Sequence, residues 1–343
     1  MLVFSFIRRA VIQGVPLLYG STGEILTEKS GNLNLGIPGI MYMGAIGGVI
    51  GGFFFEQSGA DFSLWYIKIL AVLIPLVCSL LFSCLMGLLY CFLTVSLRAN
   101  QNVTGLALTT FGVGAGNFFG GSLIKLSHAD VPTVTLSKTS EIFSSHLPFV
   151  DKLSAMAADG RCPKWVAELT STIFSYSFLA YLSIVIALIA AHVLTKTRVG
   201  LTLRSVGENP ATADAAGINV NRYKYFATCL GSMIAGLGGL YYIMDYACGV
   251  WSSNGFGDRG WLSVALVIFS LWRPNLAIIG SFLFGGLYII HNYIPNLSMQ
   301  AMELFKMSPY VMTLVVLIFV SIKEKKEALP PAHLGQNYFR EER

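Results

Sequence analysis

Long apolar segments constrain the fold of this chain more than any other feature. The four clearest are residues 67–95, 173–194, 223–244 and 299–322, and shorter or glycine-interrupted ones lie at 10–26, 35–55, 103–123, 260–271 and 275–290. A helix needs about 20 such residues to cross about 30 Å of hydrocarbon. The segments are apolar on every face, whereas barrel strands alternate apolar and polar residues. The sequence therefore predicts an all-α, polytopic membrane bundle of about nine or ten transmembrane segments.

The charge content fits the same class. Of the 343 residues, 54% are hydrophobic and only 12% are charged, which excludes an ordinary soluble domain. Lys and Arg residues near segment ends mark the cytoplasmic side of a membrane protein. They cluster at Arg8 and Arg9, at Arg98, between Lys196 and Lys224, and after Ile322. The net charge of +5 therefore reflects membrane orientation, and nucleic-acid binding is not implied.

Counting crossings back from a cytoplasmic tail at residues 323–343 gives a consistent topology for residues 1–322. It places a loop at about residues 196–222 inside and a loop at about residues 122–172 outside. It also places the N-terminus outside, which conflicts with Arg8 and Arg9. Either residues 10–26 are a true span with both arginines outside, or a broken or re-entrant element near residues 24–38 adds a crossing. We favour the broken element, because non-helical backbone is tolerated at membrane depth where protein surrounds it.

The inner loop contains signals for a short helix. Asn209 is a good N-cap, Pro210 suits the first helical position, and Gly217 can adopt the left-handed conformation that ends a helix. Such a short helix is marginal alone. We therefore expect it to be held by packing, against its own bundle or against a docked subunit.

The sequence lacks the signatures of a catalyst. No nucleophile, base or metal-ligand constellation is recognisable, so we expect no enzymatic activity, no cofactor and no metal. The glycine-rich phosphate-binding loop ending in Lys-Ser/Thr is also absent. If ATP drives this protein, the nucleotide chemistry must come from a partner.

Three blocks of sequence resemble one transporter family. They are GEILTEKSGNLNLGIPGIMYMGA at 23–45, RVGLTLRSVGENPATADAAGINVNRYKYFATCLGSMIAGLGG at 198–239, and GFGDRGWLSVALVIFSLWRPNLAIIGSFLFGGL at 255–287. All three resemble the permease subunits of ATP-binding-cassette (ABC) importers for branched-chain amino acids, ribose and nucleosides. Within this group the segment TEKSGNLNLG at 27–36 is most similar to simple-sugar or nucleoside permeases that work with a basic-membrane-protein-like binding lipoprotein.

The resemblance implies a permease domain at residues 1–322 in the bacterial inner membrane. It also implies an ABC ATPase subunit, a second permease subunit (identical or distinct), a substrate-binding lipoprotein and membrane lipid as partners. The loop at 196–222 would couple the permease to the ATPase. The coupling candidates are Arg204, Gly207, Glu208, Asn209, Pro210, Asp214 and Gly217.

Polar residues within the apolar segments are candidates for the solute path, because such groups are costly in lipid and usually face a cavity or a neighbouring helix. The first candidates are Glu24, Asn32, Asn34 and Asn117, followed by Asp245, Asn254 and Asp258. Amides and few fixed charges suit a nucleoside or simple sugar. The alternative function is a secondary transporter driven by an ion gradient, which would predict paired titratable residues near the midplane.

Overall fold

The protein is almost entirely helical in the computed structural model, which describes residues 2–127, 133–145, 170, 172–323 and 329–339. The first half contains α1 (Leu2–Glu28), α2 (Ile37–Gln57), α3 (Trp65–Cys91), α4 (Gln101–Ser127) and the short α5 (Ser137–Phe143). The second half contains α8 (Phe178–Lys196), α9 (Arg198–Glu208), α10 (Pro210–Ala215), α11 (Val220–Tyr241), α12 (Arg259–Phe269), α13 (Pro274–Ile289), α14 (Met299–Lys306) and α15 (Ser308–Lys323). Single π-helical turns at Phe92–Ser96 and Tyr242–Tyr246 extend α3 and α11, and a 3₁₀ turn at Ile290–Tyr293 follows α13.

Six helical segments in the described part of the chain are long and apolar enough to cross a membrane. They begin at Ile37, Trp65, Phe178, Val220, Pro274 and Met299. The prediction of an all-α polytopic membrane bundle is therefore confirmed. The strands of the described residues are β1 (Val134–Thr135) and β2 (Val250–Trp251), which form a two-residue antiparallel pair.

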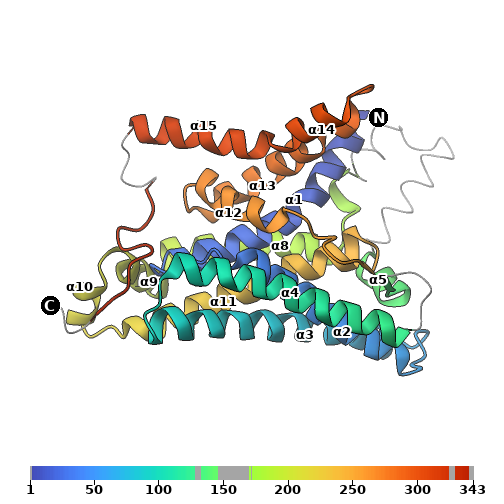
Figure 1. Ribbon diagram of the computed structural model, residues 1–343, viewed down its shortest axis with the longest axis horizontal. Helices are drawn as coiled ribbons and strands as arrows, with labels where there is room; N and C mark the ends of the chain where they lie inside the picture. Colours follow the sequence, from blue (N-terminus) through green and yellow to red (C-terminus); the bar gives the residue numbers. More distant parts are fainter. Residues whose placement is uncertain (1, 128–132, 146–169, 171, 324–328, 340–343) are drawn as a thin grey trace.

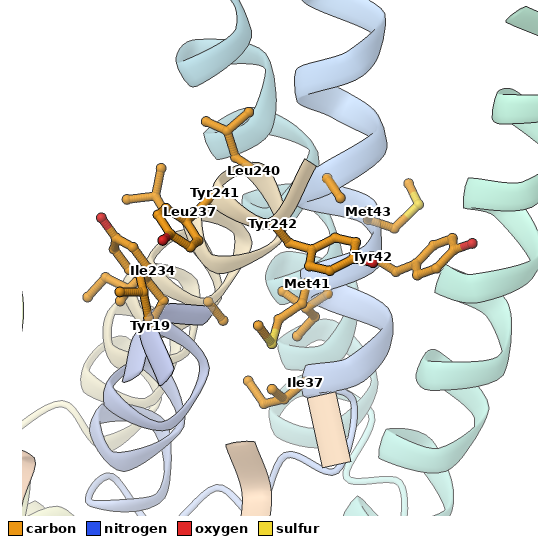
Figure 2. Packing of buried hydrophobic residues seen from close by; sticks show 14 of the residues in the cluster. Tyr19, Ile37, Met41, Tyr42, Met43, Ile234, Leu237, Leu240, Tyr241 and Tyr242 are labelled. Carbon is orange, nitrogen blue, oxygen red and sulfur yellow. The ribbon is translucent and has the colours of Figure 1, made fainter. Parts of the chain in front are cut away.

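The centre of the bundle is formed by α1, α2 and α11, with α3 and α13 packed against them (Figure 1). Figure 2 shows how Tyr19 of α1, Met41 of α2 and Ile234 of α11 contribute to one buried cluster. Small residues allow the close approach: a Cβ on Gly44 of α2 would lie 2.4 Å from the Cα of Gly236 of α11. Close approach of this kind is how helices pack in lipid, where the hydrophobic effect gives no drive between them.

The region near residues 24–38 contains a break, but the break begins later than its predicted start. Helix α1 is continuous through Glu24 to Glu28, and residues 29–36 form a turn that leads directly into α2. This turn is non-helical and mostly buried, as expected of a break inside the protein. The expected segment at 10–26 lies wholly within the single helix α1. Figure 1 shows the N-terminus at the end of the bundle opposite to α9, α10 and the C-terminus.

Three other expected segments have different boundaries. The segment at 299–322 is interrupted between α14 and α15, where Pro309 occupies the first turn of the new helix. In the segment at 173–194, residues 175–177 are non-helical and helix α8 begins at Phe178. The segment at 260–271 is the eleven-residue α12, which begins after a non-helical approach from β2. Of the expected outer loop at 122–172, residues 128–132, 146–169 and 171 lie outside the described part.

Candidate functional site

The helix expected in the inner loop is present as α10, directly after α9. The Asn209 side chain accepts a hydrogen bond from the Thr212 N–H at 3.0 Å, and Pro210 opens the helix. Gly217 has φ of +83°, and the N–H groups of Gly217 and Ile218 bond back to the carbonyls of Asp214 and Ala213. The local geometry expected from Asn209, Pro210 and Gly217 is therefore confirmed.

One face of α10 packs and the other faces outward. Pro210 and Ala213 are buried, and Ala213 forms a small cluster with Val206 and Val220. The exposed residues are Ala211, Thr212, Ala215, Ala216 and Gly217. Their side chains are small, so the exposed face of α10 is formed largely by backbone and short side chains. This face lies at the end of the bundle where the basic residues cluster.

The end of α9 contacts the turn at 29–36 without an intervening side chain. A Cβ on Gly207 would lie 2.4 Å from the carbonyl oxygen of Lys29 and 3.1 Å from the amide nitrogen of Gly31. Only glycine fits this approach. Arg204 and Glu208 of α9 line a cavity of about 660 Å³ together with Lys29 and Arg273. Gly207 thus contacts the turn that carries Asn32 and Asn34, and Arg204 and Glu208 share a cavity with Lys29 of that turn.

Three of the four path candidates form a fully buried cluster at this turn. Glu24 Oε1 accepts a hydrogen bond from the Asn34 N–H at 3.1 Å, and the Asn32 amide donates to Thr228 Oγ1 of α11 at 3.1 Å. The second carboxylate oxygen of Glu24, Asn32 Oδ1 and Asn34 Nδ2 are buried and have no hydrogen-bond partner among the described residues. None of the three side chains lines a cavity that we find in the described part of the chain.

The fourth path candidate, Asn117, belongs to a separate polar cluster. Its amide oxygen accepts from Tyr42 Oη at 2.5 Å, and its amide nitrogen donates to Asn254 Oδ1 at 3.0 Å. The Asn254 N–H in turn donates to Tyr42 Oη at 2.9 Å. Figure 2 shows Tyr42 pointing from α2 away from the cluster around Tyr19 and Ile234. Tyr42 and Asn254 line a cavity of about 230 Å³ with Thr109, Phe256, Asp258 and Trp261.

The entry into α12 beside this cavity is fixed by a buried arginine. Arg259 is 7% exposed, and its guanidinium lies 4.6 Å from the ring centroid of Tyr242 and 5.0 Å from that of Tyr246. It also donates to the Phe256 carbonyl at 2.8 Å. Stacking and hydrogen bonding of this kind offset the cost of burying a guanidinium. Arg259 therefore holds the chain turn that carries Asn254 and Asp258 to the cavity.

Sequence reasoning missed several residues of these sites. Tyr42 lies within an apolar run, and Gln101 shows no pattern that pairs it with the turn 68 residues earlier. A charged residue at the very start of an apolar segment was the available signal for Arg259. Asp245 does not line the cavity at Asn117. It accepts a hydrogen bond from the Ser177 hydroxyl. Among the described residues no group of His, Cys, Asp and Glu side chains is arranged to hold a metal ion.

Comparison with known proteins relates this chain to transport permeases. The family model for the branched-chain amino acid transport system, permease component, matches residues 6–320. The nucleoside ABC transporter permease protein NupC of Lactococcus lactis subsp. cremoris is 31% identical over 96% of this chain and 95% of its own length. The guanosine ABC transporter permease protein NupQ of Bacillus subtilis is 30% identical over 90% of this chain and 89% of its own. The putative glucose ABC transporter permease protein TsgC13 of Haloferax volcanii is 27% identical over 95% and 94%.

No solved structure matches the chain. The family match covers nearly all of the transmembrane region and agrees with the helical membrane bundle described above. The chain is thus a multi-pass membrane protein that belongs to the family of branched-chain amino acid-type ABC transport permeases.

Proposed function

We propose that this permease imports nucleosides across the bacterial inner membrane, driven by ATP hydrolysis in a separate ABC ATPase subunit. The observation that carries the proposal is the similarity to NupC and NupQ over about nine-tenths of the chain. Both relatives are named for nucleoside or guanosine transport. Membership of an ABC permease family favours ATP over an ion gradient as the driving force.

The cavity at Asn117 supports this choice of cargo. Tyr42, Thr109 and Asn254 offer hydroxyl and amide groups that match ribose hydroxyls, and Asp258 adds a carboxylate that can accept from them. Phe256 and Trp261 offer aromatic surface for a base. Asn117 adjoins the cavity through its hydrogen bonds to Tyr42 and Asn254. We assign the solute path to this polar face, with a second permease subunit opposite it and a binding lipoprotein outside.

In this proposal the buried cluster at Glu24, Asn32 and Asn34 closes the inner end of the solute path. The ATPase moves α10, and α9 transmits the movement through the contact of Gly207 with the turn. The turn then opens and exposes the unpaired polar atoms of the cluster to the solute. Unpaired buried polar groups are costly, so a state that hydrates them is favourable locally.

Uptake by the reconstituted complex tests the proposed function. The permease is co-expressed with the ATPase and binding protein encoded beside it and placed in vesicles with ATP inside. We expect uptake of labelled guanosine or uridine that requires ATP and exceeds uptake of glucose and leucine. Uptake that follows an imposed proton or sodium gradient without ATP would contradict the proposal, and preferred uptake of glucose would assign the cargo to sugars.

Replacement of Asn117 by Ala tests the path. The variant loses hydrogen bonds to the cavity wall and, by the proposal, to the nucleoside, so we expect the KM for nucleoside uptake to rise by about threefold to tenfold. Ser122→Ala on the same helix is the matched control, because within the described residues the Ser122 hydroxyl bonds to the Phe118 carbonyl of its own helix alone. Equal kinetics for both variants would move the path away from Asn117.

A further inference from the structure

The C-terminal residues 329–339, here called the C-terminal strap, return to the inner end of the bundle after α15. They contain no regular helix or strand, yet most of their hydrogen bonds join them to residues far away in the sequence. Figure 1 shows the strap descending from α15 toward α9 and α10. A segment without regular secondary structure that is held so closely needs a physical reason, because ordering a backbone costs conformational entropy.

The first set of contacts joins the strap to the coupling candidates. The Ala332 N–H donates to Glu208 Oε2 at 3.2 Å, and the His333 N–H donates to the Gly207 carbonyl at 3.1 Å. The Tyr338 hydroxyl donates to Asp214 Oδ2 of α10 at 2.8 Å, and its ring packs against Val206 and Val220. The strap therefore contacts both α9 and α10.

The second set joins the strap to the buried turn. The Gly335 N–H donates to the Gly31 carbonyl at 3.3 Å. Gln101 bridges the two segments: its amide nitrogen donates to the Gln336 carbonyl at 3.2 Å, and its amide oxygen accepts from the Leu33 N–H at 2.8 Å. Leu33 lies between Asn32 and Asn34. The strap is thus hydrogen-bonded to α10 and to the turn that carries the buried cluster.

A third contact fixes the strap to the start of α4. The Asn337 amide donates to the Arg98 carbonyl at 2.6 Å, and the Arg98 guanidinium lies 4.7 Å from the ring centroid of Phe339. Helix α4 carries Asn117 further along its length. The strap therefore joins three parts of the molecule that must move in a defined relation: α9 with α10, the turn at 29–36, and α4.

We propose that the C-terminal strap is a transmission element that carries the displacement of α10 to the buried turn and to α4. The inference rests on the proposed function, because it assumes that the ATPase moves α10. The strap is a second route for the movement of α10, in addition to the contact of Gly207 with the turn. Tyr338 is the residue that positions α10 against the strap. Tyr338 links the strap to Asp214 of α10 by a side-chain hydrogen bond, and loss of its hydroxyl removes this link while the apolar packing of Ala213 against Val206 and Val220 stays in place.

Tyr338→Phe tests the strap in the reconstituted complex. The variant keeps the ring and removes only the hydroxyl that bonds to Asp214. We expect the amount of nucleoside transported per ATP hydrolysed to fall by about threefold or more, with the ATPase rate and the yield of assembled complex retained. Gln336→Ala is the matched control, because this exposed side chain has no hydrogen bond in the described structure and only the backbone groups of Gln336 are used.

A double variant identifies the route. If Asp214 acts through Tyr338, then Tyr338→Phe combined with Asp214→Ala transports no less per ATP than Asp214→Ala alone. Additive losses would overturn the strap as the route from Asp214. A purely structural strap would lower the unfolding temperature of Tyr338→Phe and leave transport per ATP unchanged, which also overturns the proposal.

The failure of the strap and the failure of the proposed function have different signatures. If Gly217→Ala lowers transport per ATP but Tyr338→Phe does not, α10 is coupled and the strap does not transmit. If the unmodified complex shows no ATP-driven uptake at all, the proposed function fails first and the strap proposal fails with it.

Discussion

At the residue scale, the absence of a side chain at Gly207 allows α9 to contact the turn at 29–36. Its Cα faces the carbonyl of Lys29 so closely that a methyl group has no room. Gly207→Ala must push α9 away from the turn at 29–36, and overpacking of this kind typically costs about 1–3 kcal/mol. We expect a lower unfolding temperature in detergent and fewer nucleosides transported per ATP.

Gly114→Ala is the matched control for this prediction. Gly114 lies in α4 with nothing within 4 Å of an added Cβ, and alanine favours a helix over glycine. The control should unfold at the same or a slightly higher temperature. An unfolding temperature for Gly207→Ala equal to that of Gly114→Ala would contradict the close contact.

His333 gives the C-terminal strap a pH dependence. Burial lowers the pKa of His333 below its usual value of 6.5, and the nearby Lys224 lowers it further. The folded strap therefore favours neutral His333. Its contribution to stability is present above about pH 6.5 and is lost as the pH falls through the lowered pKa.

Hydrogen exchange of the strap amides measures this effect. After correction for intrinsic exchange, protection of the amides of Ala332, His333 and Gly335 should fall between pH 7.5 and pH 5.5, the range that brackets the ordinary His pKa of about 6.5. His333→Gln, which does not titrate, should show constant protection. Loss of protection in the Gln variant to the same degree would assign the change to another group.

Residue-level features could be predicted from sequence where their cause is local. Asn209, Pro210 and Gly217 act on their own backbone within a few residues, and the structure confirms their geometry. The pairing of Gln101 with Leu33, or of Tyr338 with Asp214, depends on residues brought together by the fold. No pattern in one sequence identifies such partners.

At the scale of elements, α12 depends on one buried cation. Arg259 stacks on Tyr242 and Tyr246 and bonds to the Phe256 carbonyl at the point where the chain enters the helix. Lysine keeps the charge but loses the planar stacking and the forked donors. Arg259→Lys should therefore destabilise the folded protein by about 1–3 kcal/mol and weaken nucleoside uptake.

Thermal unfolding and uptake of the Arg259→Lys protein check this prediction. Arg222→Lys, at an exposed position of α11, is the control and should behave as the unmodified protein. If both variants unfold at the same temperature as the unmodified protein, the stacked guanidinium does not hold the entry to α12.

Most elements were predictable, because membrane-length apolar runs specify helices almost by length alone. Two boundaries were not predicted. The interruption before Ser308 coincides with Pro309 in the first turn of α15, and the continuity of α1 past Glu24 depends on the protein packed around it. Glu24 is tolerated within α1 because the surrounding protein, and not lipid, covers it.

At the scale of the whole molecule, the proposed partners meet different surfaces. In the proposed function, small exposed residues of α10 face the ATPase and the polar face at Asn117 and Asn254 faces the solute path, while the N-terminal end of α1 lies at the opposite end of the bundle from α10 (Figure 1). Sequence patterns predicted the class of molecule. The division of the path candidates into a buried cluster and a cavity wall required the structure.

Crosslinking from α10 tests the central claim, that the ATPase subunit grips this helix. In a background with the six native cysteines replaced, Ala211→Cys on α10 is compared with Ser58→Cys, which is exposed at the other end of α2. A short bifunctional thiol reagent should join the Ala211→Cys permease to the ATPase subunit, with a yield that changes when ATP binds, and should not join the Ser58→Cys permease. Absence of any ATPase adduct from Ala211→Cys in an assembled, ATP-hydrolysing complex would contradict the account.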